Sequence, residues 1–151
     1  MTSTKRFVYS GAMVRTPRPT EAELAILRVL WDKGPSTVRQ VNDVLSRSRD
    51  TGYTTTLKLM QIMAEKGLVT RDEKDRTHVY AARWSQGQTQ HQLVSDLVDR
   101  AFGGSAAALV LQALSANPAS AEELSEIERL IDAHKRGKTV KSRKTSGDHN
   151  G

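Results

Sequence analysis

The most informative stretch of the chain, residues 53–80, reads YTTTLKLMQIMAEKGLVTRDEKDRTHVY. Its apolar residues recur at helical spacing until Gly67, a residue type that commonly ends helices. Two short runs with strand character follow, residues 68–71 and 77–80, and a charged segment separates them. This order predicts a helix that ends before Gly67 and a β-hairpin directly after it.

One side of this helix is predicted to face the core of the protein. Winding residues 53–66 at 100° per residue places on that side Tyr53, Thr56, Leu57, Met60, Met63 and Ala64. The other side carries small polar and long donor side chains, which can read base edges in the major groove of DNA. We therefore predict that bases are contacted by Thr54, Thr55, Lys58 and Gln61. Any exposed helix face is polar, so a merely solvated surface is the alternative.

The helix nearest the N-terminus has a clear beginning and a clear end. Thr20 and Glu23 stand at the spacing of a capping box, in which the hydroxyl and the carboxylate each accept a hydrogen bond from the other residue's amide. An apolar stripe follows, and Gly34-Pro35 ends it. A helix is thus predicted over residues 21–32.

A second helix and a loop are predicted before the helix that ends at Gly67. Ser36 and Thr37 can cap the second helix, whereas residues 46–52 are polar and suit a loop. Three helices and a hairpin within residues 19–84 indicate a winged helix-turn-helix DNA-binding domain, mainly α with a small β-hairpin wing.

Phosphate contacts are expected from residues that flank the base-reading face. Hydroxyl and basic side chains at the start of the second helix and in the hairpin would lie at the edge of the groove. They are Ser36, Thr37, Arg39, Arg71, Lys74 and Arg76. Acidic neighbours in residues 72–75 dilute the charge of the hairpin, so the wing is predicted to be a weak electrostatic site. Each arginine by itself is equally compatible with a solvated surface charge.

The apolar side chains after residue 84 have no sheet to pack against. They occupy three predicted helices, which Gly103-Gly104 and a second capping box at residues 120–123 separate. So thin a layer cannot bury its own apolar stripes, and residues 85–136 are therefore predicted to form a helical homodimerisation domain. Packing on the winged helix of the same chain is the alternative. The expected interface residues are Leu93, Leu97, Phe102, Leu109, Leu114, Leu124, Ile127 and Ile131.

Charge is distributed unevenly along the 151 residues, whose formal net charge is +6. Residues 1–18 and 137–151 are basic and lack apolar periodicity, so we predict a flexible basic arm and a disordered basic tail. Residues 85–134 contain seven acidic and two basic side chains. A polyanion such as DNA would be attracted to both ends and repelled by the segment between them, although the ends alone are also compatible with simple solvation.

Composition and spacing argue against several other classes of protein. Cysteine is absent, which excludes disulfides, thiolate metal sites and cysteine nucleophiles. The four histidines lack the spacing of metal ligands, so no metal, cofactor or catalytic residue is predicted. No apolar run approaches the ~20 residues that a membrane span requires, and the N-terminus lacks a secretory signal. The chain is therefore expected to be cytoplasmic, without membrane insertion.

These segments together resemble the penicillinase-repressor family (BlaI/MecI/CopY). Residues 19–41 resemble its opening, residues 53–80 its recognition helix and wing, and residues 102–114 its dimerisation segment. The resemblance covers about residues 19–135. It implies a homodimer that binds a dyad operator in double-stranded DNA and represses transcription, for example of antibiotic-resistance or stress genes. It also implies a membrane sensor protease pathway that relieves repression through cleavage in the dimerisation helices.

The chain departs from the family pattern at three places. The copper-responsive branch carries a cysteine cluster, so copper sensing through thiolates is excluded here. The resistance repressors are cut at an Asn-Phe bond, where this chain has Gln112-Ala113. The arginine usual in the second half of the recognition helix is Ile62, so the operator sequence is not expected to carry over. A winged-helix protein-interaction module without sequence-specific DNA binding remains the alternative function.

Overall fold

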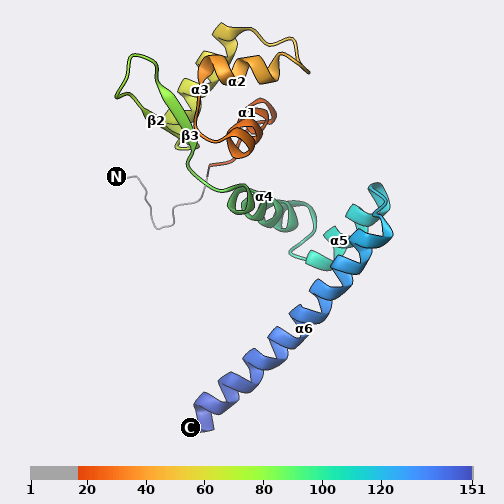
Figure 1. Cartoon of the computed structure of the whole chain (residues 1–151). Coiled ribbons are helices and arrows are strands. Elements are labelled where there is room, and N and C mark those ends of the chain that lie inside the picture. The colour runs from red at the N-terminus through yellow and green to blue at the C-terminus, as the bar shows by residue number, and fades with distance from the viewer. Residues whose placement is uncertain (1–16, 151) are drawn as a thin grey trace. The chain divides into compact units, whose positions relative to one another are not determined.

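The computed structural model describes residues 17–150, with side chains described for residues 17–137. These residues divide into two compact units on either side of the bond between Asp99 and Arg100, and each unit is considered separately (Figure 1). The elements follow in the order α1 (Glu21–Lys33), β1 (Ser36–Thr37), α2 (Val38–Leu45), α3 (Tyr53–Lys66), β2 (Val69–Asp72), β3 (Val79–Ala82), α4 (Gln86–Ala101), α5 (Ala106–Ala116) and α6 (Ala121–Asn150). The predicted fold class, mainly helical with a small hairpin, is confirmed.

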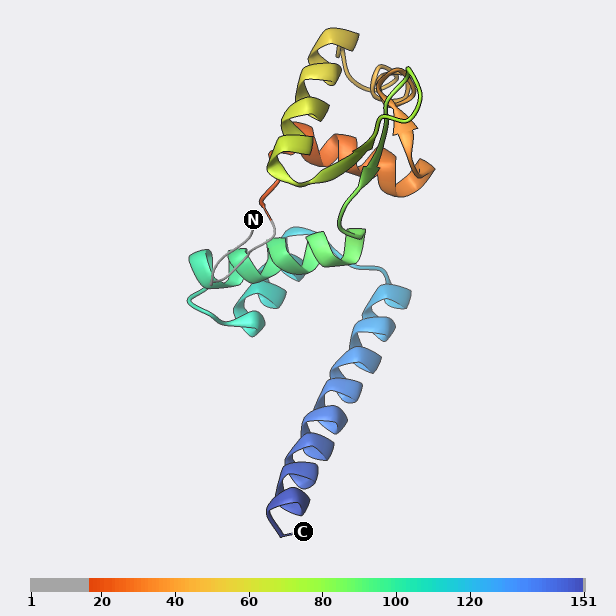
Figure 2. The ribbon, with the colours of Figure 1, turned by 90° about the vertical axis from the view of Figure 1, so that its left-hand side faces the viewer.

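The first unit contains the winged helix. Helices α1, α2 and α3 pack together, and a three-stranded antiparallel sheet of order β1-β3-β2 lies beside them. Figure 2 shows how β2 leaves the end of α3 and turns back as β3. Among residues 17–137, all buried apolar side chains that form the core come from this region: Ala25, Ile26, Leu27, Val29, Leu30, Val38, Val41, Leu45, Met60, Met63, Leu68, Val69 and Tyr80.

The helix ends of the winged helix follow the sequence signals. The capping box of Thr20 and Glu23 is present, and Thr37 forms a second box with Gln40. Helix α3 ends at Gly67, whose φ of +83° is in the left-handed region that favours glycine. The predictions of helices over residues 21–32 and 53–66 are confirmed.

The strands differ from the predicted ones in position and number. The hairpin strands begin one and two residues later than residues 68 and 77, because pairing of Asp72 with Val79 sets the turn. Ser36 and Thr37, expected as helix caps and phosphate contacts but not as a strand, form β1, where they pair with Tyr80 and Val79. A strand of two residues is too short to leave an alternating pattern in the sequence.

Two tryptophans join the winged helix to the segment that leaves its sheet. The indole nitrogen of Trp31 in α1 donates to the carbonyl of Trp84 at 2.9 Å, and that of Trp84 donates to the carbonyl of Gly67 at 3.2 Å. The guanidinium of Arg83 stacks over the Trp84 ring, with its carbon 5.2 Å from the ring centroid. These contacts fix the chain where it passes from β3 toward α4.

Helices α4 to α6 have the predicted breaks between them. Gly103 and Gly104 have positive φ angles of 57° and 85°, and the hydroxyl of Ser105 caps α5. Ser120 and Glu123 form the expected capping box at the start of α6.

The end of the chain differs from the expected disordered tail, because α6 continues through Asn150. The segment after Gly137 is rich in lysine and arginine and contains no proline. Lysine and arginine are good helix formers, and an interior glycine costs only ~1 kcal/mol. Gly137 and Gly147, both within α6, are therefore too weak as signals to end this helix.

The predicted boundary at residues 84–85 lies before α4, whereas the two compact units meet close to the end of that helix. The compact units are defined by packing within one chain, whereas the predicted boundary was defined by a role in dimer formation. The assignment of residues 85–136 to dimerisation therefore remains a proposal. Within the described residues, no single helix is long and apolar enough to cross a membrane. Helices α4 and α5 reach that length and composition only as a pair, and the chain breaks between them at Gly103 and Gly104.

Candidate nucleic-acid interface

Helix α3 presents a polar face to solvent. Thr54, Thr55, Lys58 and Gln61 are all exposed, whereas Thr56, Met60 and Met63 of the same helix are buried. Lys58 has no ion-pair partner among the side chains of residues 17–137, so its charge is not compensated locally. The four side chains predicted to read bases therefore share one accessible face.

Tyr53 is not in the core, contrary to the prediction from the helical periodicity. It is 42% exposed, and the guanidinium carbon of Arg39 lies 5.2 Å from its ring centroid. The physical reason is that Tyr53 is the first residue of α3, at the end of the helical stripe. The side chain that enters the core at this end of the stripe is that of Thr56, one turn later, which is fully buried. The first turn of α3 therefore adds an aromatic ring to the exposed surface, beside an arginine of α2.

Asn42 is a positioning residue that the sequence reasoning missed. With its amide nitrogen turned toward the loop, Asn42 donates to the hydroxyl of Thr56 at 2.8 Å and to the carbonyl of Thr51 at 2.9 Å. The N-cap of α3, Gly52, has no side chain with which to cap the helix. The side chain of Asn42 in α2 thus holds the beginning of α3 in place. An asparagine in a polar segment gives no sequence signal for such a contact.

The expected phosphate contacts near α2 do not all lie at the surface. Arg39 is exposed and has no ion-pair partner among the described side chains. Thr37 is half-buried, and its hydroxyl accepts from the amide of Gln40 at 3.2 Å. Ser36 is buried and donates its hydroxyl to the carbonyl of Gly34 at 2.8 Å, so its side chain is not available to a phosphate.

The wing carries exposed basic residues, but one of them is compensated. The Nε of Arg71 donates to the carboxylate of Glu73 at 3.0 Å. A hydrogen bond with Tyr80 and the charge of Glu73 both raise the pKa of Arg71. Lys74 and Arg76 are exposed in the turn. The pairing of Arg71 agrees with the expectation that the wing is a weak electrostatic site.

The wing also lies close to the second half of α3. Gln61, Ala64 and Glu65 of α3 line a surface depression together with Arg71 of β2. The structure thus brings one expected base-reading residue, Gln61, beside one expected phosphate contact, Arg71. Glu65 places a negative charge in the same depression.

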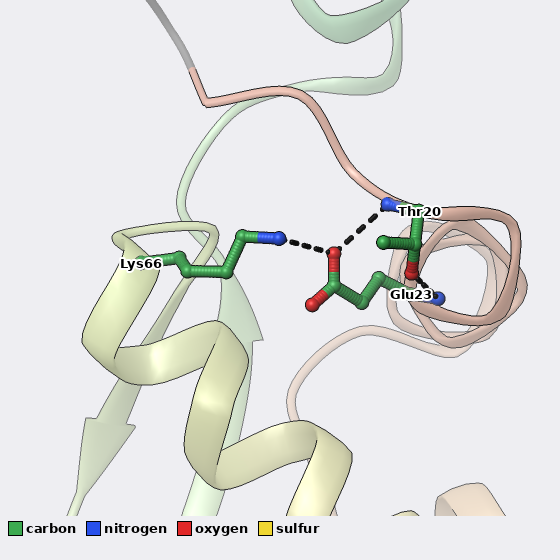
Figure 3. A network of polar contacts seen from close by, with 3 residues as sticks. All are labelled: Thr20, Glu23 and Lys66. Atoms are coloured by element: carbon green, nitrogen blue, oxygen red, sulfur yellow. Dashed lines mark hydrogen bonds and ion pairs between the residues drawn. The ribbon is translucent and has the colours of Figure 1, made fainter.

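A partly buried ion pair holds α1 against the end of α3 (Figure 3). The Oε1 atom of Glu23 accepts from the Nζ of Lys66 at 2.7 Å and from the amide of Thr20 at 2.9 Å. Burial raises the pKa of the Glu23 carboxyl, but hydrogen bonds from Lys66 and Thr20 and the charge of Lys66 outweigh it, and the net pKa is lowered. This network orients α3 from its C-terminal end, as Asn42 does from its N-terminal end.

The residues expected at a dimer interface all remain accessible in the single chain. Leu97, Leu124 and Ile131 are exposed. The remaining five are only partly buried: Leu93, Phe102, Leu109, Leu114 and Ile127. Gln112 and Ala113, at the place that corresponds to the family's cleavage site, are exposed within α5. Relief of repression by a membrane sensor protease pathway stays a prediction.

The described residues contain no group of three histidine, aspartate or glutamate side chains placed to hold a metal ion.

Comparison with known proteins gives consistent matches. The family model described as penicillinase repressor matches residues 19–133. The chain is 37% identical over 101 residues to a transcriptional regulator BlaI of Mycobacterium tuberculosis (strain CDC 1551 / Oshkosh). That alignment covers 65% of this chain and 73% of the relative. It is 22% identical over 126 residues to the penicillinase repressor of Bacillus licheniformis, and this alignment covers 83% of this chain and 98% of the relative.

A solved structure, the solution structure of the DNA-binding domain of the repressor BlaI, aligns with a TM-score of 0.44 and 21% identity. That alignment covers 50% of this chain and 93% of the other. The family match spans most of the chain, from the start of the winged helix to the middle of α6. The chain therefore belongs to the penicillinase repressor family.

Proposed function

We propose that this protein is a transcriptional repressor that binds a dyad operator in double-stranded DNA as a homodimer. Its role is binding rather than catalysis, and it acts in the cytoplasm, where it reaches the chromosome. The observation that carries the proposal is the exposed face of α3 with Thr54, Thr55, Lys58 and Gln61. Membership of the penicillinase repressor family supports the same role.

The chemistry of this face suits the major groove. Threonine hydroxyls both donate and accept hydrogen bonds, lysine donates, and the glutamine amide can bond to adenine through two atoms. Residues in the first half of a recognition helix usually reach the base edges. Arg39, Lys74 and Arg76 are exposed beside this helix or in the wing and supply charge for the phosphates.

Homodimer formation is supported by the accessible apolar side chains of α4 to α6. Leu111 and Leu130 are each 69% exposed, and α5 has no buried residue. A single chain that leaves so many leucines in water is expected to cover them with a second surface. A twofold dimer would present two recognition helices about one DNA turn apart, which matches a dyad operator.

The test begins with selection of duplexes from a random library by the full chain. Lys58→Ala and Thr54→Ala should each weaken binding to the selected operator by roughly 1–3 kcal/mol, with the fold unchanged by circular dichroism. Gln90→Ala is the control, because it truncates an exposed polar side chain of α4, outside the winged helix, and should leave the affinity unchanged. Equal affinity of parent and both alanine variants would show that another surface reads the DNA.

The alternative, a winged-helix module that binds protein, gives a different result in the same experiment. Phosphate contacts release counterions, so DNA binding must weaken as salt rises. A parent chain that selects no sequence and shows no salt-dependent shift with any duplex would favour the protein-interaction module.

A further inference from the structure

Arg39 contacts the aromatic ring of Tyr53, whereas Lys66 and Arg71 of the winged helix pair with carboxylates. Arg39 is the second residue of α2, and Tyr53 is the first residue of α3. The loop between the two helices brings them together, so that the guanidinium lies over the ring at 5.2 Å. Both side chains are accessible to solvent. An exposed aromatic ring is notable here because aromatics make up only 5% of the chain.

The contact with the ring orients Arg39 and leaves hydrogen-bond donors available. The guanidinium carbon lies over the ring, and the five N–H donors are spread around the guanidinium, so those directed away from the ring can bond to a phosphate. Arg39 also lacks a carboxylate partner among the described side chains, in contrast to Arg71, whose Nε is bonded to Glu73. The ring holds in one place a side chain that would otherwise lose rotamer freedom on binding.

We propose that Tyr53 positions Arg39 to hold a phosphate of the DNA backbone next to the bases that α3 reads. This inference rests on the proposed function and adds a positioning residue to it. Tyr53 directly precedes Thr54 and Thr55, so a phosphate bound here lies beside the expected base contacts. Arg39 supplies the charge, and the Tyr53 ring supplies its orientation.

The experiment measures binding of the full chain to its selected operator over a range of potassium chloride concentrations. Arg39→Ala should lower affinity about tenfold and reduce the slope of log K against log salt by about one for each bound protomer. Tyr53→Leu should lower affinity about two- to fivefold, the range expected for an exposed stacked cation. Tyr53→Phe keeps the ring and should retain the parent affinity.

A double-mutant cycle tests whether the two residues act together. In the Arg39→Ala background, Tyr53→Leu should have no further effect, because the side chain that the ring positions is gone. Additive losses, or a loss with Tyr53→Phe as large as with Tyr53→Leu, would overturn the proposal. A purely structural role for the ring would lower thermal stability in both backgrounds, so the melting temperature of each variant is measured as well.

Arg83→Ala is the matched control, since Arg83 stacks over Trp84 at the same 5.2 Å but lies near Gly67, at the other end of α3. Its salt slope should equal that of the parent. A slope reduced as much as in Arg39→Ala would mean that any lost positive charge suffices, and the proposal would fail. If the parent selects no operator at all, the proposed function fails instead, and the two failures are therefore distinguishable.

Discussion

The winged helix and the C-terminal helices differ in how far their apolar side chains are buried within one chain. In the winged helix, leucines, valines and methionines from three helices and the hairpin cover one another, and Met60 and Met63 are fully buried. In α5 and α6, leucines of comparable size remain largely in water, as Leu111 and Leu130 are. The apolar core of the first region is covered within one chain, whereas the second region leaves apolar side chains exposed, which supports the proposed dimer.

The largest effect is expected from a charge placed in the apolar surface of α6. Ile127→Asp would bury an unpaired carboxylate in a dimer, which costs several kcal/mol. The variant should sediment as a monomer in analytical ultracentrifugation, and its affinity for a full palindrome should fall about a hundredfold or more. Its binding to a single half-site should hardly change.

Ser125→Asp is the control for this variant, because it adds the same charge to the same helix at an exposed polar position. It should remain a dimer and keep its operator affinity. A parent chain that sediments as a monomer would contradict the assignment of this surface to dimer formation.

A second pair of substitutions compares the two regions directly in the monomeric Ile127→Asp background. Met60→Ala removes a side chain with 0% exposure and should lower the free energy of unfolding by about 2–5 kcal/mol. Leu111→Ala removes a side chain that is 69% exposed and should cost less than about 0.5 kcal/mol. Urea denaturation measures both. Equal costs would mean that α5 packs within the single chain, the alternative to dimer formation.

A smaller loss of stability is expected when the partly buried ion pair of the winged helix is broken. Lys66→Met leaves the buried Glu23 carboxylate with hydrogen bonds from Thr20 but without the charge of Lys66. Breaking a fully buried pair costs about 3–5 kcal/mol, and because Lys66 is one third exposed, we expect about 1–3 kcal/mol in urea denaturation. Lys33→Met should change stability by less than about 0.5 kcal/mol, because Lys33 pairs with Asp32 at the surface. A larger loss for Lys33→Met would reverse this ranking.

The fold of the winged helix could be predicted because its signals are local. Capping boxes such as that of Thr20 and Glu23 need residues three apart, and the helical stripe of α3 is visible within fourteen residues. The strand β1 escaped prediction because two residues carry no alternation. The continuation of α6 beyond Gly137 also escaped it, because helix propensity outweighed two glycines, Gly137 and Gly147.

The candidate site could be predicted only in part, because several of its contacts join separate segments of the chain. The polar face of α3 follows from periodicity, whereas the contact of Lys66 with Glu23 spans residues that are far apart in sequence. Tyr53 shows how periodicity fails at a helix end, since the preceding turn that would cover its ring does not exist. Ser36 shows a different limit of sequence reasoning. Its hydroxyl suits a phosphate, but in the fold it donates to the backbone carbonyl of Gly34.

The smallest expected effect concerns the pH dependence of the ion pair between Glu23 and Lys66. The folded-state pKa of Glu23 is lowered, so the pair contributes its full stability above the unfolded-state pKa of glutamate, about 4.3, and this contribution is lost as the pH falls through the folded-state pKa. In Lys66→Met, burial still raises the pKa of the Glu23 carboxyl, but the hydrogen bond and charge of Lys66 no longer oppose it. Protonation then removes an unfavourable buried charge.

The two chains should therefore converge as the solution becomes acidic. The difference in free energy of unfolding between parent and Lys66→Met should be greatest at neutral pH and should shrink as the pH falls below about 4.3. Urea denaturation between pH 7 and pH 3 at one protein concentration measures it. Glu23→Gln with and without Lys66→Met is the control, because without the carboxylate the difference should not depend on pH. A difference between parent and Lys66→Met that stays constant over this range would mean that Lys66 stabilises α3 through packing of its aliphatic chain rather than through its charge.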